Sequence, residues 1–349
     1  MGETADLLEW VQGRGAGRPS VLATIISVEG HAYRKEGAAM ILAVDGETVG
    51  HVSPGCLEDD LKERVAGLYA SGNCEIVAYN MRPEEDAVWG EAIGCGGTVR
   101  ILLEPIVGAL AEALRRAASL VEAGHTAVLA RTAVPGGGME YGIEELQMAE
   151  KGERSEKGRP FFISVFEPRA RLVVFGAGAD SEALCAVAAR IGFRVFAADW
   201  RSSRLEAMNR CGMAVAIGRA DRISAELALG PADYVVLCSH QMQRDREMLE
   251  EALTAGVGYI GIMGSRSRVR ALLEGLPMSA SIHAPVGLSI GAAGADEIAI
   301  SIAAELIAER RGRRPSGRGS ANAYRGTLFG GGERFPDGET EARFGACSR

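Results

Sequence analysis

Short apolar runs change their arrangement near residue 170 of this chain. Before that point, apolar or β-branched runs lie between glycine turns, as is typical of strands in a β-rich unit; they cover 21–28, 39–44, 76–79 and 99–103. From residue 171 onward, comparable runs alternate with helical patterns; they cover 171–175, 194–199, 234–238 and 257–262. Strands that alternate with helices predict a parallel sheet covered on both faces. We therefore predict an α/β protein in which a mixed, β-rich α+β domain precedes a parallel αβ domain.

These patterns divide the chain into four parts. We predict an N-terminal domain over 1–135, a polar linker over 136–168, the parallel αβ domain over 169–310 and a tail over 311–349. A hairpin, or a loop over a site, is the alternative for part of the linker. The tail has no periodicity and lacks the apolar residues that would offset its ordering entropy, so we expect it to be disordered. An RNA-binding arm is the alternative for its basic start, but no aromatic residues are interleaved there.

Composition favours a soluble globular protein. Of the 349 residues, 47% are hydrophobic and 24% are charged, which allows sizeable cores. The formal net charge of −8 disfavours binding to nucleic acid or to an anionic membrane surface. No run of about 18 apolar residues is present, so we expect no membrane span and a cytoplasmic protein.

Glycines follow the first strand of the second domain, in Gly176-Ala-Gly178-Ala-Asp-Ser181. Gly176 permits a tight turn, Gly178 lets a phosphate approach the backbone, and Ser181 is small enough for strand–helix packing. Amides at the start of the helix then face the anion. Asp199 ends the next strand, where a carboxylate can accept hydrogen bonds from a ribose diol. The combination predicts a Rossmann-like domain that binds a phosphate-bearing ligand, NAD(P) or another nucleotide included; a packing turn that binds nothing is the alternative.

Further candidates follow later strands, at the carboxyl edge where open parallel sheets bind ligands. They are His240, Asp245, Gly264, Ser265 and Arg266. His240 is a candidate proton donor or, alternatively, a cap on the following helix. The last three offer amides, a hydroxyl and a guanidinium, which suit an oxyanion or a phosphate.

Seven cysteines are present, an odd number without any Cys-x-x-Cys pair, which argues against a disulfide framework or a structural zinc site. Cys56 is expected in the first turn of a helix, where the dipole favours thiolate, although Glu58 and its acidic neighbours oppose this effect. Cys95 lies in Gly94-Cys95-Gly96-Gly97, without neighbouring side chains. Two thiols beside glycines suggest a site for a soft metal or for sulfur transfer, and inert burial is the alternative.

Taken together, these motifs resemble the XdhC/CoxI family, accessory factors of xanthine dehydrogenase and related molybdenum hydroxylases. The resemblance runs from about residue 10 to residue 308. In the N-terminal domain its motifs are 28–40, which contains Arg34, 55–58, which contains Cys56, and 94–97, which contains Cys95. In the second domain its motifs are Gly176-Ala-Gly178, Asp199, Ser239-His240, Asp245, Gly261-Ile-Met-Gly264-Ser265-Arg266, 283–291 and 297–305.

Three positions depart from the family pattern. Pro54 stands where a glycine is usual, and Tyr33 replaces a proline. Met242 occupies the place of a second histidine after His240, which argues against a metal chelated there.

The resemblance implies a non-catalytic maturation factor. Such proteins bind the molybdenum cofactor (molybdopterin), protect it while a cysteine desulfurase supports its sulfuration, and deliver it to an apo molybdenum hydroxylase of the xanthine dehydrogenase type. A homodimer is expected, and Cys56 and Cys95 are candidate contacts to the molybdenum. The cofactor-binding candidates are Cys56, Cys95, Arg34, Gly176, Gly178, Asp199, His240, Asp245, Gly264, Ser265 and Arg266.

Two other functions fit part of the sequence. An NAD(P)-dependent oxidoreductase with His240 as its acid would use the glycine turn and Asp199, but it leaves both glycine-flanked cysteines without a role. A sulfur-handling enzyme that works through a cysteine persulfide would use those cysteines instead.

Overall fold

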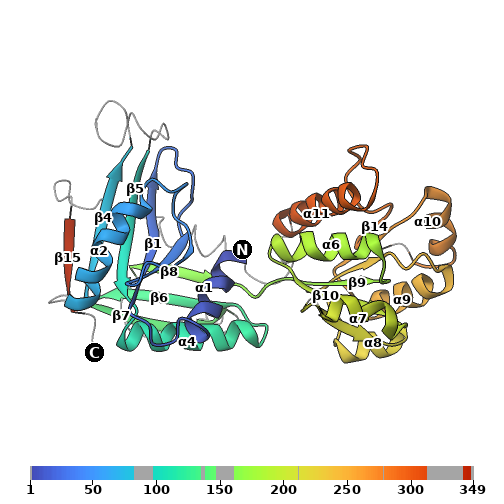
Figure 1. The fold of residues 1–349 in the computed structure, drawn as a ribbon, viewed down its shortest axis with the longest axis horizontal. Coiled ribbons are helices and arrows are strands. Elements are labelled where there is room, and N and C mark those ends of the chain that lie inside the picture. The colour runs from blue at the N-terminus through green and yellow to red at the C-terminus, as the bar shows by residue number, and fades with distance from the viewer. Residues whose placement is uncertain are drawn as a thin grey trace. The chain divides into compact units, whose positions relative to one another are not determined.

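The computed structural model describes residues 2–81, 97–134, 138–146, 161–210, 212–277, 279–312 and 341–346. The chain divides into two compact units (Figure 1). The first comprises Glu3–Pro168 and Gly317–Arg349, and the second comprises Arg169–Ser316. Within the described ranges, no helix is both long enough and apolar enough to cross a membrane.

A six-stranded parallel sheet forms the centre of the second unit. Its strand order is β11-β10-β9-β12-β13-β14, so the chain starts in the middle, fills one edge and then fills the other. This is the doubly wound order of a Rossmann fold, whose ligand crevice lies where the two halves diverge, here between β9 and β12. The strands are β9 (Arg171–Phe175), β10 (Arg194–Asp199), β11 (Ala214–Ile217), β12 (Tyr234–Leu237), β13 (Tyr259–Ile262) and β14 (Ile282–His283).

Helices cover both faces of this sheet. On one face, Leu172 and Val174 of β9 pack with α6 (Ala179–Arg190) and α11 (Ala295–Gly312), which lie side by side in Figure 1. On the other face, Val173 and Phe175 pack with residues of the helices that follow β11, β12 and β13. Burial on both faces explains why these strands read as continuous apolar runs in the sequence. The remaining helices are α7 (Ser202–Arg210), α8 (Ala220–Glu226), α9 (Met242–Thr254) and α10 (Arg266–Leu273).

The first unit contains two antiparallel sheets. The larger has the order β15-β4-β5-β1-β2-β3, and the smaller has the order β7-β6-β8. The larger sheet consists of β1 (Ser20–Glu29), β2 (Ala39–Ala43), β3 (Thr48–Gly50), β4 (Asn73–Asn80), β5 (Thr98–Pro105) and β15 (Glu341–Ala346). The smaller consists of β6 (Ala127–Ala133), β7 (Met139–Glu145) and β8 (Phe162–Phe166).

Among the residues that the structure describes, three helices pack on these sheets. α2 (Glu58–Ser71) buries Leu61 and Val65 against one face of the larger sheet. α1 (Gly2–Gln12) and α4 (Gly108–Glu122) share a second core with strands of both sheets. The unit is therefore a mixed α+β domain, and together with the parallel sheet it confirms the predicted fold class.

A buried ion pair joins the two sheets of the first unit. The Nε of Arg131 on β6 donates to both carboxylate oxygens of Glu104 on β5, at 2.9 and 2.8 Å. Its Nη1 donates to the Ser164 hydroxyl on β8 at 2.9 Å, and neither charged side chain is exposed. Because unpaired charges are costly inside a protein, this pair constrains how the strands pack.

Two segments differ from the sequence-based expectation. The range 136–168, predicted as a linker with a hairpin as the alternative for part of it, contains β7 and β8, which both pair antiparallel with β6. Met139 and Phe162 of these strands are buried in a core. The polar residues around those strands concealed them in the sequence. Within the tail predicted as disordered, β15 pairs antiparallel with β4. That pairing uses main-chain groups, so apolar composition did not reveal it.

Candidate functional site

The glycine turn lies at the point where the two halves of the parallel sheet diverge. Gly176 follows β9 with a φ of 106°, a left-handed conformation that favours glycine. A Cβ at this position would overlap the backbone of Ser239, which follows β12. Glycine is therefore required both by its φ and by the close approach of the second loop.

Gly178 precedes α6 and leaves space above the turn. It is the N-cap of the helix, and as a glycine it has no side chain with which to cap the first-turn amides. A Cβ built on Gly178 would meet no atom within 4 Å. Uncapped amides beside open space at a helix N-terminus suit a phosphate group.

The side chain of Asp199, predicted from the sequence to accept hydrogen bonds from a ribose, points into the protein interior. Its Oδ2 accepts from the amide of Ala177 at 2.7 Å and from Nη2 of Arg201 at 2.8 Å. Its Oδ1 accepts from the amide and the Nε of Arg201, at 2.8 and 2.9 Å. The carboxylate is fully buried, and these four hydrogen bonds fill its acceptor positions. Asp199 therefore holds the glycine turn and Arg201, and in this arrangement it has no free oxygen for the role expected from the sequence.

Opposing effects act on the ionisation of Asp199. Burial raises its pKa, while the hydrogen bonds from Arg201 and from the amide of Ala177 lower it, and the net shift is downward. The carboxylate therefore stays ionised near neutral pH, which keeps its bonds to the turn intact.

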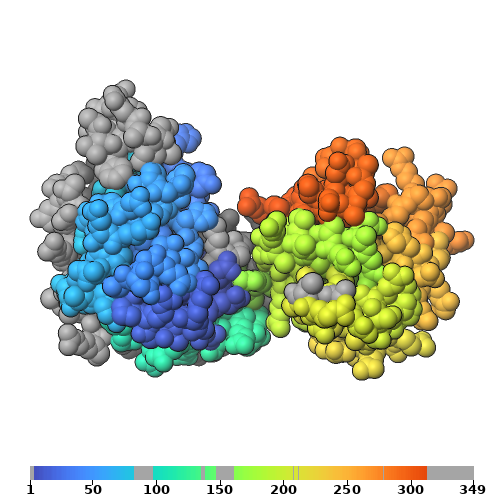
Figure 2. Space-filling view, in the orientation of Figure 1, coloured from blue at the N-terminus to red at the C-terminus, as the bar shows by residue number. Residues whose placement is uncertain are grey.

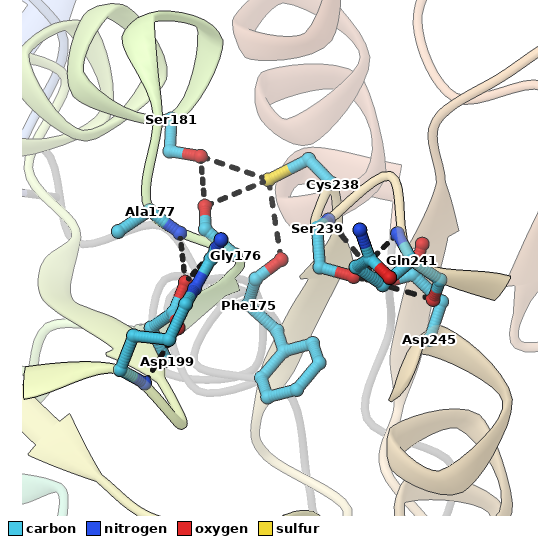
Figure 3. A network of polar contacts seen from close by, with 10 residues as sticks. Phe175, Gly176, Ala177, Ser181, Asp199, Cys238, Ser239, Gln241 and Asp245 are labelled. Atoms are coloured by element: carbon cyan, nitrogen blue, oxygen red, sulfur yellow. Dashed lines mark hydrogen bonds and ion pairs between the residues drawn. The ribbon is translucent and has the colours of Figure 1, made fainter. Parts of the chain in front are cut away.

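Behind the turn, a buried polar cluster locks β9 to β12 (Figure 3). The carbonyl of Gly176 accepts from the Ser181 hydroxyl and from the Cys238 thiol. The same thiol donates to the carbonyl of Phe175 at 3.3 Å. Burial raises the pKa of Cys238 to about 12, so this thiol is a packing group and not a nucleophile.

The loop after β12 is organised by Asp245. This carboxylate is fully buried in α9 and accepts from the amide and the hydroxyl of Ser239. Its second oxygen accepts from Nη2 of Arg268 at 2.6 Å. Asp245, a predicted cofactor contact, is thus occupied by the protein itself and acts on the loop that carries His240.

His240 is the residue that this loop presents. Its side chain is 61% exposed, and its Nε2 lies 3.3 Å from Oδ2 of Asp180 in the first turn of α6. Its φ of 59° is left-handed, which is uncommon for a residue other than glycine. Such backbone conformations gather at functional sites. His240 therefore borders the glycine turn, as the position of both loops at one sheet edge predicted.

The segment after β13 has a structural task. The hydroxyl of Ser265 accepts from the amide of Arg268 at 3.3 Å and so caps α10. Gly264 has a φ of 141°, and Arg266 is exposed at the start of the helix. Of these three predicted contacts, Arg266 offers its charge to solvent, while the Ser265 hydroxyl is engaged within the chain.

In the first unit, Cys56 lies in a loop arranged around Ser53 and Glu58. It precedes Leu57, the N-cap of α2, and is therefore not in the first turn of the helix as the sequence predicted. Glu58, at the start of α2, accepts from the amides of Val52 and Ser53, at 3.2 and 2.8 Å, and from the Ser53 hydroxyl. The Ser53 hydroxyl oxygen accepts in turn from the amide of Leu57 at 3.1 Å and from the Cys56 thiol at 3.5 Å. Cys56 is half-buried at the surface of this arrangement.

The charge on Glu58 is supported by hydrogen bonds. Burial raises its pKa, whereas the bonds from Ser53 and from the amide of Val52 lower it, with a net downward shift. Glu58 therefore stays ionised near neutral pH, which keeps its hydrogen bonds to the loop intact.

Arg34 and Cys56 line the same small pocket, together with Tyr33. Burial lowers the pKa of the Arg34 guanidinium. A neighbouring cleft of about 590 Å³ is lined by Tyr33, His51, Ser53 and Lys62 among others. The part of the chain that carries these residues is drawn in blue in the space-filling view (Figure 2). The structure thus brings two of the three predicted N-terminal site residues together.

The third predicted residue, Cys95, lies outside the described residues. Gly97, two positions later, is described: a Cβ there would collide with main-chain atoms of Glu29 and His31, so only glycine fits. In the described part of the chain, no group of three or more His, Cys, Asp or Glu side chains is arranged to hold a metal ion.

Sequence reasoning missed the residues that position the glycine turn, the loop after β12 and the loop before α2. Arg201, Arg268 and Ser53 carry those roles. A signal existed for Arg201, which follows Asp199 by two residues, and for Ser53, which precedes the acidic helix start. Arg268 is distant from Asp245 in sequence, and only the fold brings them together.

Known proteins with similar sequences and structures place these observations in a family. The model of the XdhC Rossmann domain matches residues 172–306, and the model of the XdhC and CoxI family matches residues 14–80. A relative in Bacillus subtilis (strain 168), a probable xanthine dehydrogenase subunit, is 31% identical over 312 residues, 84% of this chain and 93% of that protein.

Two further relatives extend the comparison. The molybdenum cofactor insertion chaperone PaoD of Escherichia coli (strain K12) is 24% identical over 310 residues, 86% of each chain. A crystal structure described as a xanthine dehydrogenase from Bacillus halodurans has a TM-score of 0.80 at 33% identity, covering 94% of this chain and 100% of that one. The chain therefore belongs to the XdhC and CoxI family.

Proposed function

We propose that this protein is a maturation factor that binds the molybdenum cofactor as cargo and delivers it to a xanthine dehydrogenase-type hydroxylase. The observation that carries the proposal is the glycine turn, which combines open space at Gly178 with the uncapped first turn of α6. The cofactor carries a phosphate, which such a turn accommodates. The similarity over most of its length to a molybdenum cofactor insertion chaperone supports the same cargo.

The first unit supplies the soft ligands in this proposal. Cys56 borders a pocket with Arg34, and its thiolate form would be a soft sulfur ligand for the molybdenum of the cofactor. Cys95 is proposed as the second thiol on the sequence alone. A cysteine desulfurase is the proposed source of sulfur, and an apo-hydroxylase is the proposed recipient. A homodimer and a cytoplasmic location complete the proposal.

The decisive experiment asks whether the full chain carries the pterin. We expect protein purified anaerobically from a host that makes the cofactor to contain molybdopterin, identified by fluorescence of its oxidised derivative. Protein from a host unable to make molybdopterin is the blank. Absence of pterin from the first preparation would overturn the proposal.

Two variants locate the cargo. Gly178→Val fills the space above the glycine turn, so we expect it to lower pterin content at least about tenfold while the fold persists. Gly230→Val is the matched control, because a Cβ at Gly230 also meets no atom within 4 Å and Gly230 lies away from the turn in sequence. Equal pterin content in both variants would remove the glycine turn from the site.

The thiol is tested by activation of a co-expressed hydroxylase. We expect Cys56→Ser to impair activation, with circular dichroism unchanged. Cys185→Ala is the control, since Cys185 is buried in α6 and burial raises its pKa to about 12. Full activation by the Cys56 variant would show that the first unit works without this thiol.

A further inference from the structure

We propose that the cargo is held as its phosphate monoester, and that Arg201 excludes dinucleotide forms of the cofactor by occupying the carboxylate that would read their ribose. This inference rests on the proposed function and adds the chemical form of the ligand. It also excludes NAD-type dinucleotides bound in the ordinary Rossmann manner, with phosphate on the glycine turn and ribose at the end of the second strand.

The position that reads ribose is closed by the chain itself. A ribose diol needs an acceptor at the end of β10, and Asp199 is the acid there. Its two oxygens already accept four hydrogen bonds, three of them from the amide, Nε and Nη2 of Arg201. The side chain of Asp199 is fully buried, so a diol would have to displace Arg201 before it reached a free lone pair.

Arg201 is held in this position from two directions. Two of its nitrogens bond the carboxylate side by side, a planar arrangement that arginine forms with particular strength. Its guanidinium carbon lies 4.2 Å from the ring centroid of Trp200. The guanidinium of Arg244 lies over the same ring at 5.6 Å, and Phe175 packs against that ring at 5.9 Å. Displacing Arg201 would therefore break an ion pair and a cation–π contact together.

The phosphate position differs from the ribose position. Gly178 has open space where a Cβ would lie, and it has no side chain to cap the helix that follows it. The phosphate position of a nucleotide site is thus open, and the ribose position is filled by Arg201. This arrangement admits a phosphate without an attached ribose. The two positions are linked by the hydrogen bond from the amide of Ala177 to Asp199. The carboxylate at the ribose position therefore also holds the glycine turn at the phosphate position.

The first arm of the test identifies the bound form. The full chain is produced in a host that makes both the monophosphate and the cytidine dinucleotide forms of the cofactor. We expect pterin without a stoichiometric amount of CMP after acid hydrolysis. Pterin with equimolar CMP would overturn this inference and leave the proposed function standing, whereas no pterin at all would overturn the proposed function.

The second arm needs no pterin. We expect Arg201→Met to bind NAD⁺ at least about tenfold more tightly than the wild type in calorimetry, which is the effect of one recovered hydrogen bond to a charged group. Arg204→Met, an exposed arginine in the next helix, is the control and should leave NAD⁺ affinity unchanged. If the wild type binds NAD⁺ as tightly as Arg201→Met does, Arg201 does not close the site.

A third measurement remains informative if Arg201→Met fails to fold. Wild-type protein is titrated with AMP and with 2′,3′-dideoxy-AMP, which differ only in the ribose hydroxyls. Equal affinities, or no binding of either nucleotide, agree with a closed ribose position. A preference for AMP of about tenfold, the effect of one hydrogen bond to a charged group, would mean that the diol is read and would overturn the inference.

Discussion

Two loops in different units of this protein share one construction. In the first unit, the amide and hydroxyl of Ser53 donate to Glu58, which begins α2. In the second unit, the amide and hydroxyl of Ser239 donate to Asp245 in the first turn of α9. In each case the serine oxygen also accepts the amide two residues later. A buried acid on a helix start thus shapes the loop before it in both units.

The loops differ in how the acid is neutralised and in what they present. Asp245 is paired with the guanidinium of Arg268, whereas Glu58 accepts from two amides and a hydroxyl. The first loop presents Cys56, half-buried, and the second presents His240, mostly exposed. The comparison teaches that one arrangement of a serine and a buried acid can present a thiol in one unit and an imidazole in the other.

The largest loss of stability is expected where a substitution removes the acid partner of a largely buried guanidinium. Asp245→Asn removes the anion that Arg268 pairs with inside the second unit, so we expect a loss of about 3 kcal/mol in the free energy of unfolding. Chemical denaturation measures this loss. Glu250→Gln on the same helix breaks only an exposed pair with Arg246 and should cost less than about 1 kcal/mol. The double variant Asp245→Asn/Arg268→Met should recover part of the loss; an additive loss would mean that the pair is not the cause.

A smaller loss is expected in the first loop, where hydrogen-bond donors and not a guanidinium lose their acceptor. Glu58→Gln retains one acceptor oxygen and loses the other, so we expect the free energy of unfolding to fall by about 1–2 kcal/mol in chemical denaturation. Glu63→Gln, an exposed acid on the same helix, should be neutral. If Glu58→Gln costs as much as Asp245→Asn, the proposed difference between the two loops is wrong.

The first loop should also respond to acid. The pKa of Glu58 lies below its usual value of 4.5 in the folded protein, so its contribution to stability is present above that value. The contribution is lost as pH falls through the lowered pKa. We therefore expect the stability difference between wild type and Glu58→Gln to be constant from pH 7 to about 5 and to shrink below about 4. A difference that grows on acidification would reverse the sign of this argument.

The smallest effect on stability is expected at His240. There, a matched control distinguishes the effect of backbone strain on stability from an effect of the side chain on pterin binding. His240→Gly removes a left-handed conformation that costs a non-glycine residue about 1 kcal/mol, partly offset by the greater freedom of the unfolded chain. Ala228→Gly is the matched control, because Ala228 also has a positive φ, of 44°. Both variants should gain less than about 1 kcal/mol in the free energy of unfolding, and only His240→Gly should lower pterin content. Equal pterin content would make His240 a structural residue.

Much of the second unit could be predicted from sequence because its signals are local. The buried strand 171–175 and the two glycines that follow it specify a strand, a turn and a helix within a few residues. The meeting of Gly176 with Ser239 follows from strand order, which the alternation of strands and helices indicates.

Side-chain direction could not be predicted in the same way. Asp199 stands where a ribose-binding acid stands, yet it faces inward because Arg201 and the amide of Ala177 offer it closer donors. A pattern of residue types indicates that an acid is present at this position, but it does not indicate which donors of the folded chain will hydrogen-bond to that acid. The same limit applies to Ser53 and Glu58, whose pairing depends on the path of the loop between them.

Strand β15 makes the first unit discontinuous in sequence, so the second unit is an insertion between β8 and β15. During synthesis, the β4 edge of the larger sheet stays uncovered until residues 341–346 have been made, because β15 is the strand that pairs with β4. Until then β4 presents unpaired main-chain groups, a template for strands of other molecules. Removing the chain after Gly312 would make that exposure permanent, and a fusion partner joined directly after β15 would be tethered to the first unit rather than to the second.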